Sequence, residues 1–194
     1  MFTSTECWDE DAGLPRGVLE VSEALATDPA ATAALWDNLL SRDLVSEFHA
    51  RMRPVDDPLL YLLADPRRVR SVVSDGLWVR LVDVGRALAQ RHYASPVDVV
   101  IEVADELCPQ NAGRWRLAEE AGVAPAGFRA TCERTTAPAD VVLPVWAVGA
   151  AYLGGTGLKA MANAGLITEA TPGSLAALST AMSWEPAPWC PMTF

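Results

Sequence analysis

The stretch Leu77-Trp78-Val79-Arg80-Leu81-Val82-Asp83-Val84 decides the fold class, because it joins a strand pattern to the start of a helix. Its odd-numbered positions from 77 to 81 are all leucine or valine, an alternation typical of a half-buried strand. Asp83 then stands where a helix N-cap is expected, before a helix through Arg91. This order of elements predicts a mixed α/β (α+β) fold from about residue 67 onwards.

Further strands and helices are predicted on both sides of this stretch. Upstream, Asp28-Pro29 is typical of an N-cap followed by proline at the first helical position, and the helix lies between predicted strands at 18–24 and 44–52. Downstream, we expect strands at 97–103, 114–117 and 128–133, the last two paired antiparallel, and helices at 146–153, 158–164 and from 171 onwards. Residues 1–13 hold an acidic cluster without periodicity, which indicates a tail or an edge segment.

Composition excludes several classes of protein. With 194 residues the chain can bury a real core, and 15 Lys+Arg against 25 Asp+Glu give a net charge of −10, which argues against nucleic acid as a partner. The sequence shows neither a secretory leader nor an apolar run long enough to cross a bilayer, so we expect a soluble, cytoplasmic protein that does not bind membranes. The four cysteines lack the spacing of a zinc site.

Four weaker signals each have a structural and a functional interpretation. For His49 and His92 a structural or solvent-facing role is favoured over metal binding, and for Asp56-Asp57 a turn is favoured over paired catalytic carboxylates. The glycines of 152–159 precede a predicted helix, but their spacing is not that of a P-loop, so a helix-turn-helix junction is favoured over a phosphate site. The seven tryptophans are mostly expected in the core, although several facing one cavity would form a wall for an apolar or cationic ligand.

The carboxy-terminal segment is the most informative feature of the sequence. Pro186, Pro188 and Pro191 stiffen it, and Trp189 and Phe194 offer aromatic anchors, so we expect the tail to dock. A docked tail would bring its free α-carboxylate with it, and burial beside aromatic rings would raise the pKa of that carboxylate toward that of a useful general base. The alternative is a packed tail with a solvated carboxylate.

Several separate motifs occur in order along the chain, namely Pro54-Val55-Asp56-Asp57-Pro58-Leu59, Leu63-Ala64-Asp65-Pro66-Arg67, residues 75–84, Ala130-Thr131-Cys132-Glu133-Arg134-Thr135, Tyr152-Leu153-Gly154-Gly155 and the ending from Ala187. Together they closely resemble the carboxy-terminal half of the enhanced intracellular survival (Eis) family of GNAT N-acetyltransferases, and the resemblance covers about residues 14–194. It implies a sterol-carrier-protein-like sheet packed with helices, preceded by a strand-helix-strand remnant of a GNAT domain. The domains then are an acidic tail at 1–13, a partial GNAT-like segment at 14–66 and a sterol-carrier-protein-like domain at 67–194.

The resemblance also implies a site. The family acetylates amines of small cationic molecules with acetyl-CoA and forms oligomers. Its acetyl-CoA site is an amino-terminal GNAT domain with an R/Q-x-x-G-x-G/A loop and a general-acid tyrosine, and this sequence contains neither that loop nor room for that domain. The resemblance assigns one catalytic role to this sequence: the terminal carboxylate of Phe194 resembles the family's general base. The predicted ligand-binding residues are Trp189, Cys190, Thr193, Trp146 and Trp78. Thr193 stands where an acidic residue is expected, and Pro144, Trp146 and Ala147 stand at positions expected to be more polar, which favours a more apolar cavity.

Three functions remain open from the sequence. The chain is expected to bind a small, largely apolar or aromatic molecule near its C-terminus, without an acetyl-CoA site or a metal of its own. Alternatively, it is a cofactor-free enzyme of secondary metabolism that uses the Phe194 carboxylate as a base. In the third interpretation it is the acceptor-side half of a split N-acetyltransferase whose GNAT partner supplies acetyl-CoA. An unpaired sheet edge predicts a homo-oligomer or a GNAT-domain partner in each case.

Overall fold

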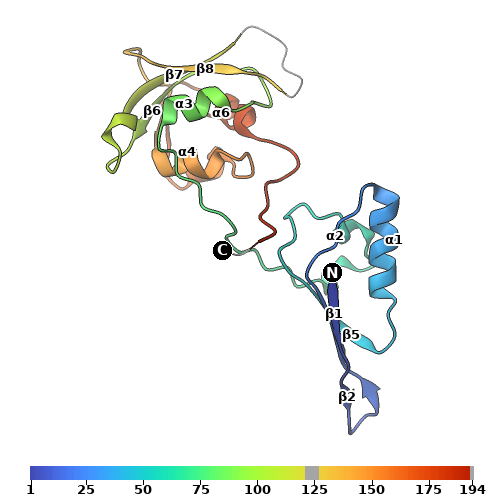
Figure 1. Cartoon of the computed structure of the whole chain (residues 1–194). Helices are drawn as coiled ribbons and strands as arrows, with labels where there is room; N and C mark the ends of the chain where they lie inside the picture. Colours follow the sequence, from blue (N-terminus) through green and yellow to red (C-terminus); the bar gives the residue numbers. More distant parts are fainter. Residues whose placement is uncertain (121–126, 193–194) are drawn as a thin grey trace. The chain divides into compact units, whose positions relative to one another are not determined.

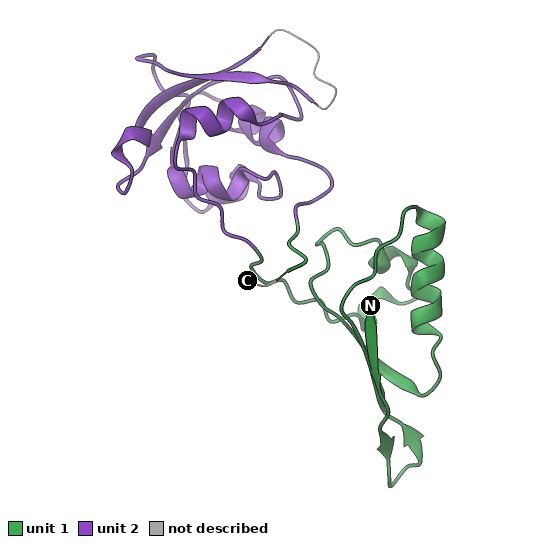
Figure 2. Cartoon of the chain, viewed as in Figure 1, with its two compact units in different colours: residues 1–76, 189–194 green, residues 77–188 purple. Residues whose placement is uncertain are grey.

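The computed structural model describes residues 1–120 and 127–192 and forms two compact units (Figures 1 and 2). Unit 1 contains residues 1–76 together with the chain from Trp189 onwards, and unit 2 contains residues 77–188. The units divide at residue 76, whereas the predicted boundary was at residue 66.

Unit 1 is a small sheet with one long helix. Its elements are β1 (Phe2–Thr5), β2 (Trp8–Asp9), β3 (Leu14–Pro15), β4 (Gly17–Val21), α1 (Pro29–Leu40), β5 (Val45–Ala50), α2 (Leu59–Leu62) and the 3-10 helix η1 (Pro66–Arg68). The sheet order is β1-β4-β5, with β1 antiparallel and β5 parallel to β4, and β2 pairs with β3 as a hairpin. The predicted strand-helix-strand arrangement is therefore confirmed, and residues 2–5 form a sheet edge and not a free tail.

The cap predicted at Asp28 forms the start of α1. Asp28 Oδ1 accepts a hydrogen bond from the Ala31 backbone N–H at 2.8 Å, and Pro29 occupies the first turn. The helix then packs on β4 through buried Trp36 and Leu39. Among the described residues of unit 1, five form this buried cluster, namely Leu19, Val21, Ala24, Trp36 and Leu39. The hydrophobic core of unit 1 is therefore small.

Unit 2 is a five-stranded sheet with helices (Figure 1). Its elements are α3 (Val84–Gln90), β6 (Asp98–Ala104), the 3-10 helix η2 (Pro109–Asn111), β7 (Gly113–Glu119), β8 (Ala130–Arg134), β9 (Val141–Pro144), α4 (Val145–Ala151), α5 (Leu158–Asn163), β10 (Thr168–Glu169) and α6 (Ser174–Met182). The strand order is β10-β9-β6-β7-β8. The antiparallel pairing of β7 with β8 confirms the prediction, and β9 lies parallel to β6.

The two faces of this sheet differ in polarity. Along β6, Val99, Ile101 and Val103 are buried in the core, whereas Glu102 and Asp98 pair with arginines of β7 on the solvent side. Large side chains with less than 2% exposure fill the interior, among them Tyr93, Leu88, Ile101, Leu117, Leu158 and Leu178. The described interior of unit 2 is thus a packed core.

The strand predicted at 77–82 is wrong as an element of this structure. Residues 77–81 adopt no regular secondary structure and Val82 lies in a bend. The alternation holds for Leu81, which is buried, and for Val79, which packs against the core, but Leu77 is exposed and no described strand pairs with this segment. No helix in the described ranges is long and apolar enough to cross a membrane.

Candidate functional site

A pocket of about 230 Å³ lies in unit 1, where the carboxyl ends of β4 and β5 meet the carboxy-terminal segment. Its lining consists of Met1, Ser22, Glu23, Met52, Arg53, Trp189 and Pro191. Ser22 and Glu23 directly follow β4, and Met52 and Arg53 follow β5. Because β4 and β5 run parallel, the residues that leave them converge at one edge of the sheet, which is a common place for a ligand site.

Met52 has an unusual backbone conformation at this edge. Its φ is +52°, in the left-handed region that side chains other than glycine rarely occupy. Such conformations cost about 1–3 kcal/mol and are concentrated at ligand sites and switch regions. The sequence contained no signal for this residue, because methionine has no preference for the left-handed region.

The two charged side chains of the pocket differ in their pairing. Arg53 Nε donates to Asp57 Oδ2 at 2.5 Å, and Arg53 Nη1 donates to the Ala24 carbonyl oxygen at 2.9 Å. Asp57 also accepts from the Leu59 backbone N–H, which confirms its predicted turn role. Among the described residues, the Glu23 carboxylate has no hydrogen-bond or ion-pair partner. The Met1 ammonium, which also lines the pocket, donates to the Glu23 carbonyl oxygen at 2.6 Å, so the Glu23 carboxylate is left available to a ligand.

The structure places part of the predicted site in this pocket. Trp189 is 39% exposed and lines it together with Pro191. Cys190 does not line the pocket; its Cβ lies near Gly76, and its thiol donates to the Met192 carbonyl oxygen at 3.2 Å. Thr193 and Phe194 lie outside the described residues, so their predicted roles stay predictions.

Trp78 and Trp146 belong to unit 2 and do not line this pocket. Trp78 precedes α3 and is 84% exposed, and Trp146, in α4, is 49% exposed. An open groove of about 330 Å³ lies nearby in unit 2, between residues 79–83, α3 and Tyr152, but neither tryptophan lines it. The predicted aromatic wall is therefore represented in the unit 1 pocket by Trp189.

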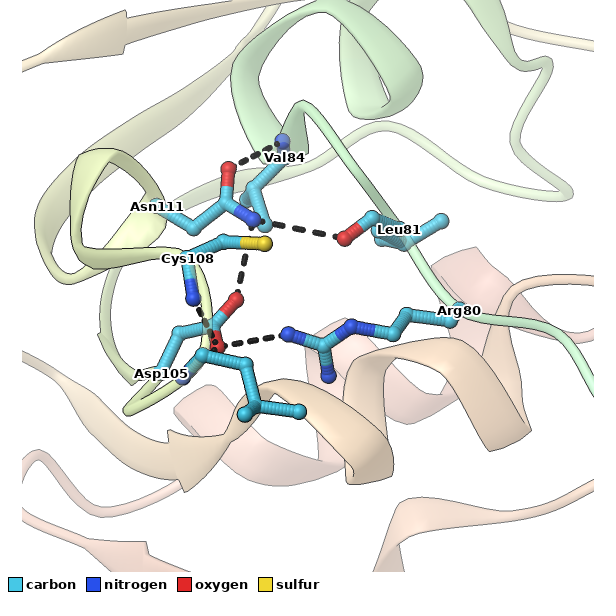
Figure 3. A network of polar contacts seen from close by, with 7 residues as sticks. Arg80, Leu81, Val84, Asp105, Cys108 and Asn111 are labelled. Carbon is cyan, nitrogen blue, oxygen red and sulfur yellow. Dashed lines mark hydrogen bonds and ion pairs between the residues drawn. The ribbon is translucent and has the colours of Figure 1, made fainter.

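A polar network centred on Asp105 holds the segment before α3 (Figure 3). Asp105 Oδ1 accepts from Arg80 at 2.6 Å and from the Cys108 backbone N–H at 3.0 Å, and Oδ2 accepts from Asn111 Nδ2 at 2.9 Å. Burial of the Asp105 carboxylate opposes its ionisation, but the hydrogen bonds from Asn111, Cys108 and Arg80 outweigh this and lower its pKa to about 2. Asn111 Oδ1 also accepts from the backbone N–H of Val84, the first residue of α3. The network is a structural brace.

His49 lies in a second charged cluster, on the sheet of unit 1. Its Nδ1 and Nε2 atoms contact Glu20 and Glu47 at 2.7 and 2.9 Å. Hydrogen bonding to Glu47 and then to Glu20 raises the pKa of His49 above its usual value. In the described ranges, no three His, Cys, Asp or Glu side chains come together as potential metal ligands. The contact of His49 with Glu20 joins the neighbouring strands β4 and β5, and its contact with Glu47 lies within β5.

The glycine-rich turn at 152–159 is filled by protein. A Cβ on Gly154 would lie 2.6 Å from Trp184 Cβ, and one on Gly155 would lie 2.7 Å from Pro188 Cδ. These glycines thus permit close packing of the segment that follows α6, as the preferred helix-turn-helix interpretation requires. They do not form a phosphate cradle.

Comparison with known proteins supports the division into two parts. The sterol carrier protein domain family matches residues 84–191, and the acetyltransferase (GNAT) domain family matches residues 2–81. An uncharacterized N-acetyltransferase of Streptomyces avermitilis is 47% identical over 180 residues, which are 93% of this chain and 42% of the relative. The N-acetyltransferase Eis of Mycobacterium tuberculosis is 36% identical over 138 residues, 69% of this chain and 31% of that protein.

A solved structure gives the same result. The crystal structure of Eis1 from Mycobacterium abscessus matches with a TM-score of 0.75 and 36% identity, over 92% of this chain and 44% of Eis1. The chain thus spans less than half the length of these relatives.

Proposed function

We propose that the chain is the acceptor-side half of an N-acetyltransferase, because it belongs to the Eis-like family of GNAT-related proteins that carry a sterol carrier protein domain. In this proposal the chain binds a small amine with a largely apolar or aromatic body in the unit 1 pocket. A GNAT portion, on this polypeptide or on another, supplies the acetyl-CoA site. The chain and its GNAT portion form the working assembly.

The observation that carries the proposal is the composition of the pocket. The ring of Trp189 and the side chains of Met52 and Pro191 suit an apolar or aromatic body. Glu23 contributes a carboxylate that suits an ammonium group, because Arg53 is already paired with Asp57 and the Met1 ammonium donates to the Glu23 backbone carbonyl oxygen. A volume of about 230 Å³ is below the usual range of about 300–1,000 Å³ for drug-sized ligands, so the acceptor is small.

The terminal carboxylate of Phe194 is the proposed general base. Pro191 lines the pocket, and Phe194 follows it in the sequence by three residues. In this role the carboxylate takes a proton from the bound amine. The pocket residues hold and orient the amine while the proton is removed.

The glycine-rich turn at 152–159 does not form a cradle for the pyrophosphate of acetyl-CoA, since Trp184 and Pro188 fill it. We therefore assign the donor site to the GNAT portion and derive no step through acetyl-CoA from this chain.

The test combines the chain with the amino-terminal portion of the S. avermitilis relative, which precedes the matched residues, and a panel of aromatic and aliphatic amines. Release of free CoA thiol is measured with acetyl-CoA present. We expect acetylation only when both halves are present, and loss of it when Phe194 is deleted. Trp189→Ala should raise KM at least about tenfold, whereas Trp8→Ala, on the hairpin of the same unit and outside the pocket, should not.

Two results would contradict the proposal. Turnover of an amine without acetyl-CoA would indicate a cofactor-free enzyme instead. Native mass spectrometry that finds a retained apolar ligand, together with no acetylation by the combined halves, would indicate a carrier.

A further inference from the structure

Residues 77–82 form an extended segment whose backbone is unpaired. Among the described residues, none of its N–H groups donates a hydrogen bond. Of its carbonyl oxygens, that of Leu81 accepts one, from Asn111 Nδ2 at 3.3 Å. A row of free donors and acceptors on an extended chain is a template for pairing with another strand.

The side chains of this segment are divided as in a half-buried strand. Leu81 is 4% exposed and Val79 packs against the core of unit 2. Leu77, Trp78 and Val82 are 55%, 84% and 70% exposed. Neighbouring exposed apolar side chains of this size mark an interaction surface.

Unit 2 holds the segment in place on its own. Arg80 is tied to Asp105 at 2.6 Å, and the Val79 carbonyl oxygen lies against Gly149 of α4, where any larger residue would collide with it. Because the segment is already ordered, a partner strand would lose less binding free energy to ordering it.

A candidate to cover the segment is the portion of the relatives that this chain does not match. The GNAT domain match runs from residue 2 to residue 81 and so ends within it. More than half of the length of the relatives lies outside the region that this chain matches. We propose that residues 77–82 pair as a β-strand with an extended strand of that GNAT portion and that Trp78 packs against it. This inference rests on the proposed function and names its docking surface.

Hydrogen exchange at these six amides tests the pairing. The full chain is compared alone and with the amino-terminal portion of the S. avermitilis relative, and exchange is followed by mass spectrometry. We expect fast exchange at 77–82 in the chain alone and exchange slowed about tenfold or more in the complex. Slow exchange in the isolated chain through self-association would overturn the proposal, because a second copy would then cover the segment.

A pair of matched variants tests the side-chain contribution. Trp78→Ser and Tyr61→Ser each remove an aromatic ring that is more than 80% exposed, so neither change should unfold the chain. We expect Trp78→Ser to weaken binding of the GNAT portion about tenfold, with Tyr61→Ser unchanged. Equal affinities for both variants and the unaltered chain would count against the proposal.

The outcomes separate this inference from the proposed function. If the two halves bind and acetylate an amine while the amides at 77–82 still exchange fast, the docking surface is wrong and the function stands. If the halves bind and protect 77–82 without acetylating any amine, the docking surface stands and the function fails. Absence of any complex overturns both.

Discussion

Gly85 of α3 lies directly against the indole ring of Trp115 of β7, so that a Cβ at this position would overlap ring atoms Cζ3 and Cη2. The ring cannot move away easily, because Trp115 Nε1 donates to the Asn111 carbonyl oxygen at 2.9 Å. The Arg134 guanidinium also covers the ring at 4.1 Å from its centroid. The contact fixes α3 against the sheet.

Gly85→Ala should therefore destabilise unit 2. Alanine gains about 1 kcal/mol of helix propensity over glycine, but overpacking a rigid core costs about 1–3 kcal/mol. We expect a net loss in the free energy of unfolding, measured by urea denaturation. Gly157→Ala is the matched control, since its nearest neighbour is Ser179 Oγ at 3.9 Å. A Gly85→Ala variant as stable as the unaltered chain would contradict the described packing.

Asp105→Asn should lower the stability of unit 2 at neutral pH and flatten its acid dependence. Because the pKa of Asp105 is lowered to about 2, the stabilisation from its ionised form is present above about pH 4 and is lost as the pH falls toward 2. Denaturation at several pH values between 2 and 7 measures this. Asp98→Asn, which removes an exposed pair with Arg116, should change little.

His49→Gln should remove a pH dependence from unit 1. The pKa of His49 is raised by Glu47 and Glu20, and Arg51 is the further charge near this cluster, 3.9 Å from Glu20. The stabilisation is therefore fully present below about pH 6.5 and is lost as the pH rises through the higher folded-state pKa. Histidine NMR titration and denaturation from pH 5 to 9 check this, with His92→Gln as control. An NMR pKa of His49 below 6.5 would refute the cluster.

Glu23→Gln should reduce the preference of the pocket for cations. We expect phenethylamine to bind up to about fivefold more tightly than the neutral 2-phenylethanol, and the substitution to abolish this difference. Trp189→Ala should weaken both ligands, because both rings pack on the indole. Calorimetric titration at low and high salt provides the measurement. Equal affinity of the unaltered protein for both ligands would exclude a role for the Glu23 charge.

The predictable parts of the fold are those with local signals. Asp28-Pro29 identified the start of α1, and alternation identified β7 and β8. Alternation failed at 77–82, because it predicted the inward direction of Val79 and Leu81 but not the exposure of Leu77, and it says nothing about whether a neighbouring strand is present. The short strands β9 and β10 were missed, since four and two residues are too few to show a period.

The candidate site was predicted only where a residue carries a local sequence signal. Trp189 stood out because prolines surround it, and the structure places it in the pocket. Glu23, Met52 and Arg53 were missed because they are brought together by the parallel pairing of β4 and β5, across about thirty residues of sequence. No local motif reports such a contact.

The return of the chain to unit 1 at Trp189 gives the molecule a double attachment. Unit 2 is an insertion with two covalent connections to unit 1, one at residues 76–77 and one at 188–189. A protease that cuts the exposed Val72-Val73 stretch would leave fragments 1–72 and 73–194, and the second fragment would still be held to the first by the packing of Trp189 and Pro191 in the unit 1 pocket. Nicked protein should therefore remain one particle on gel filtration and separate into two bands under denaturing conditions. Limited proteolysis followed by native sizing tests the insertion directly.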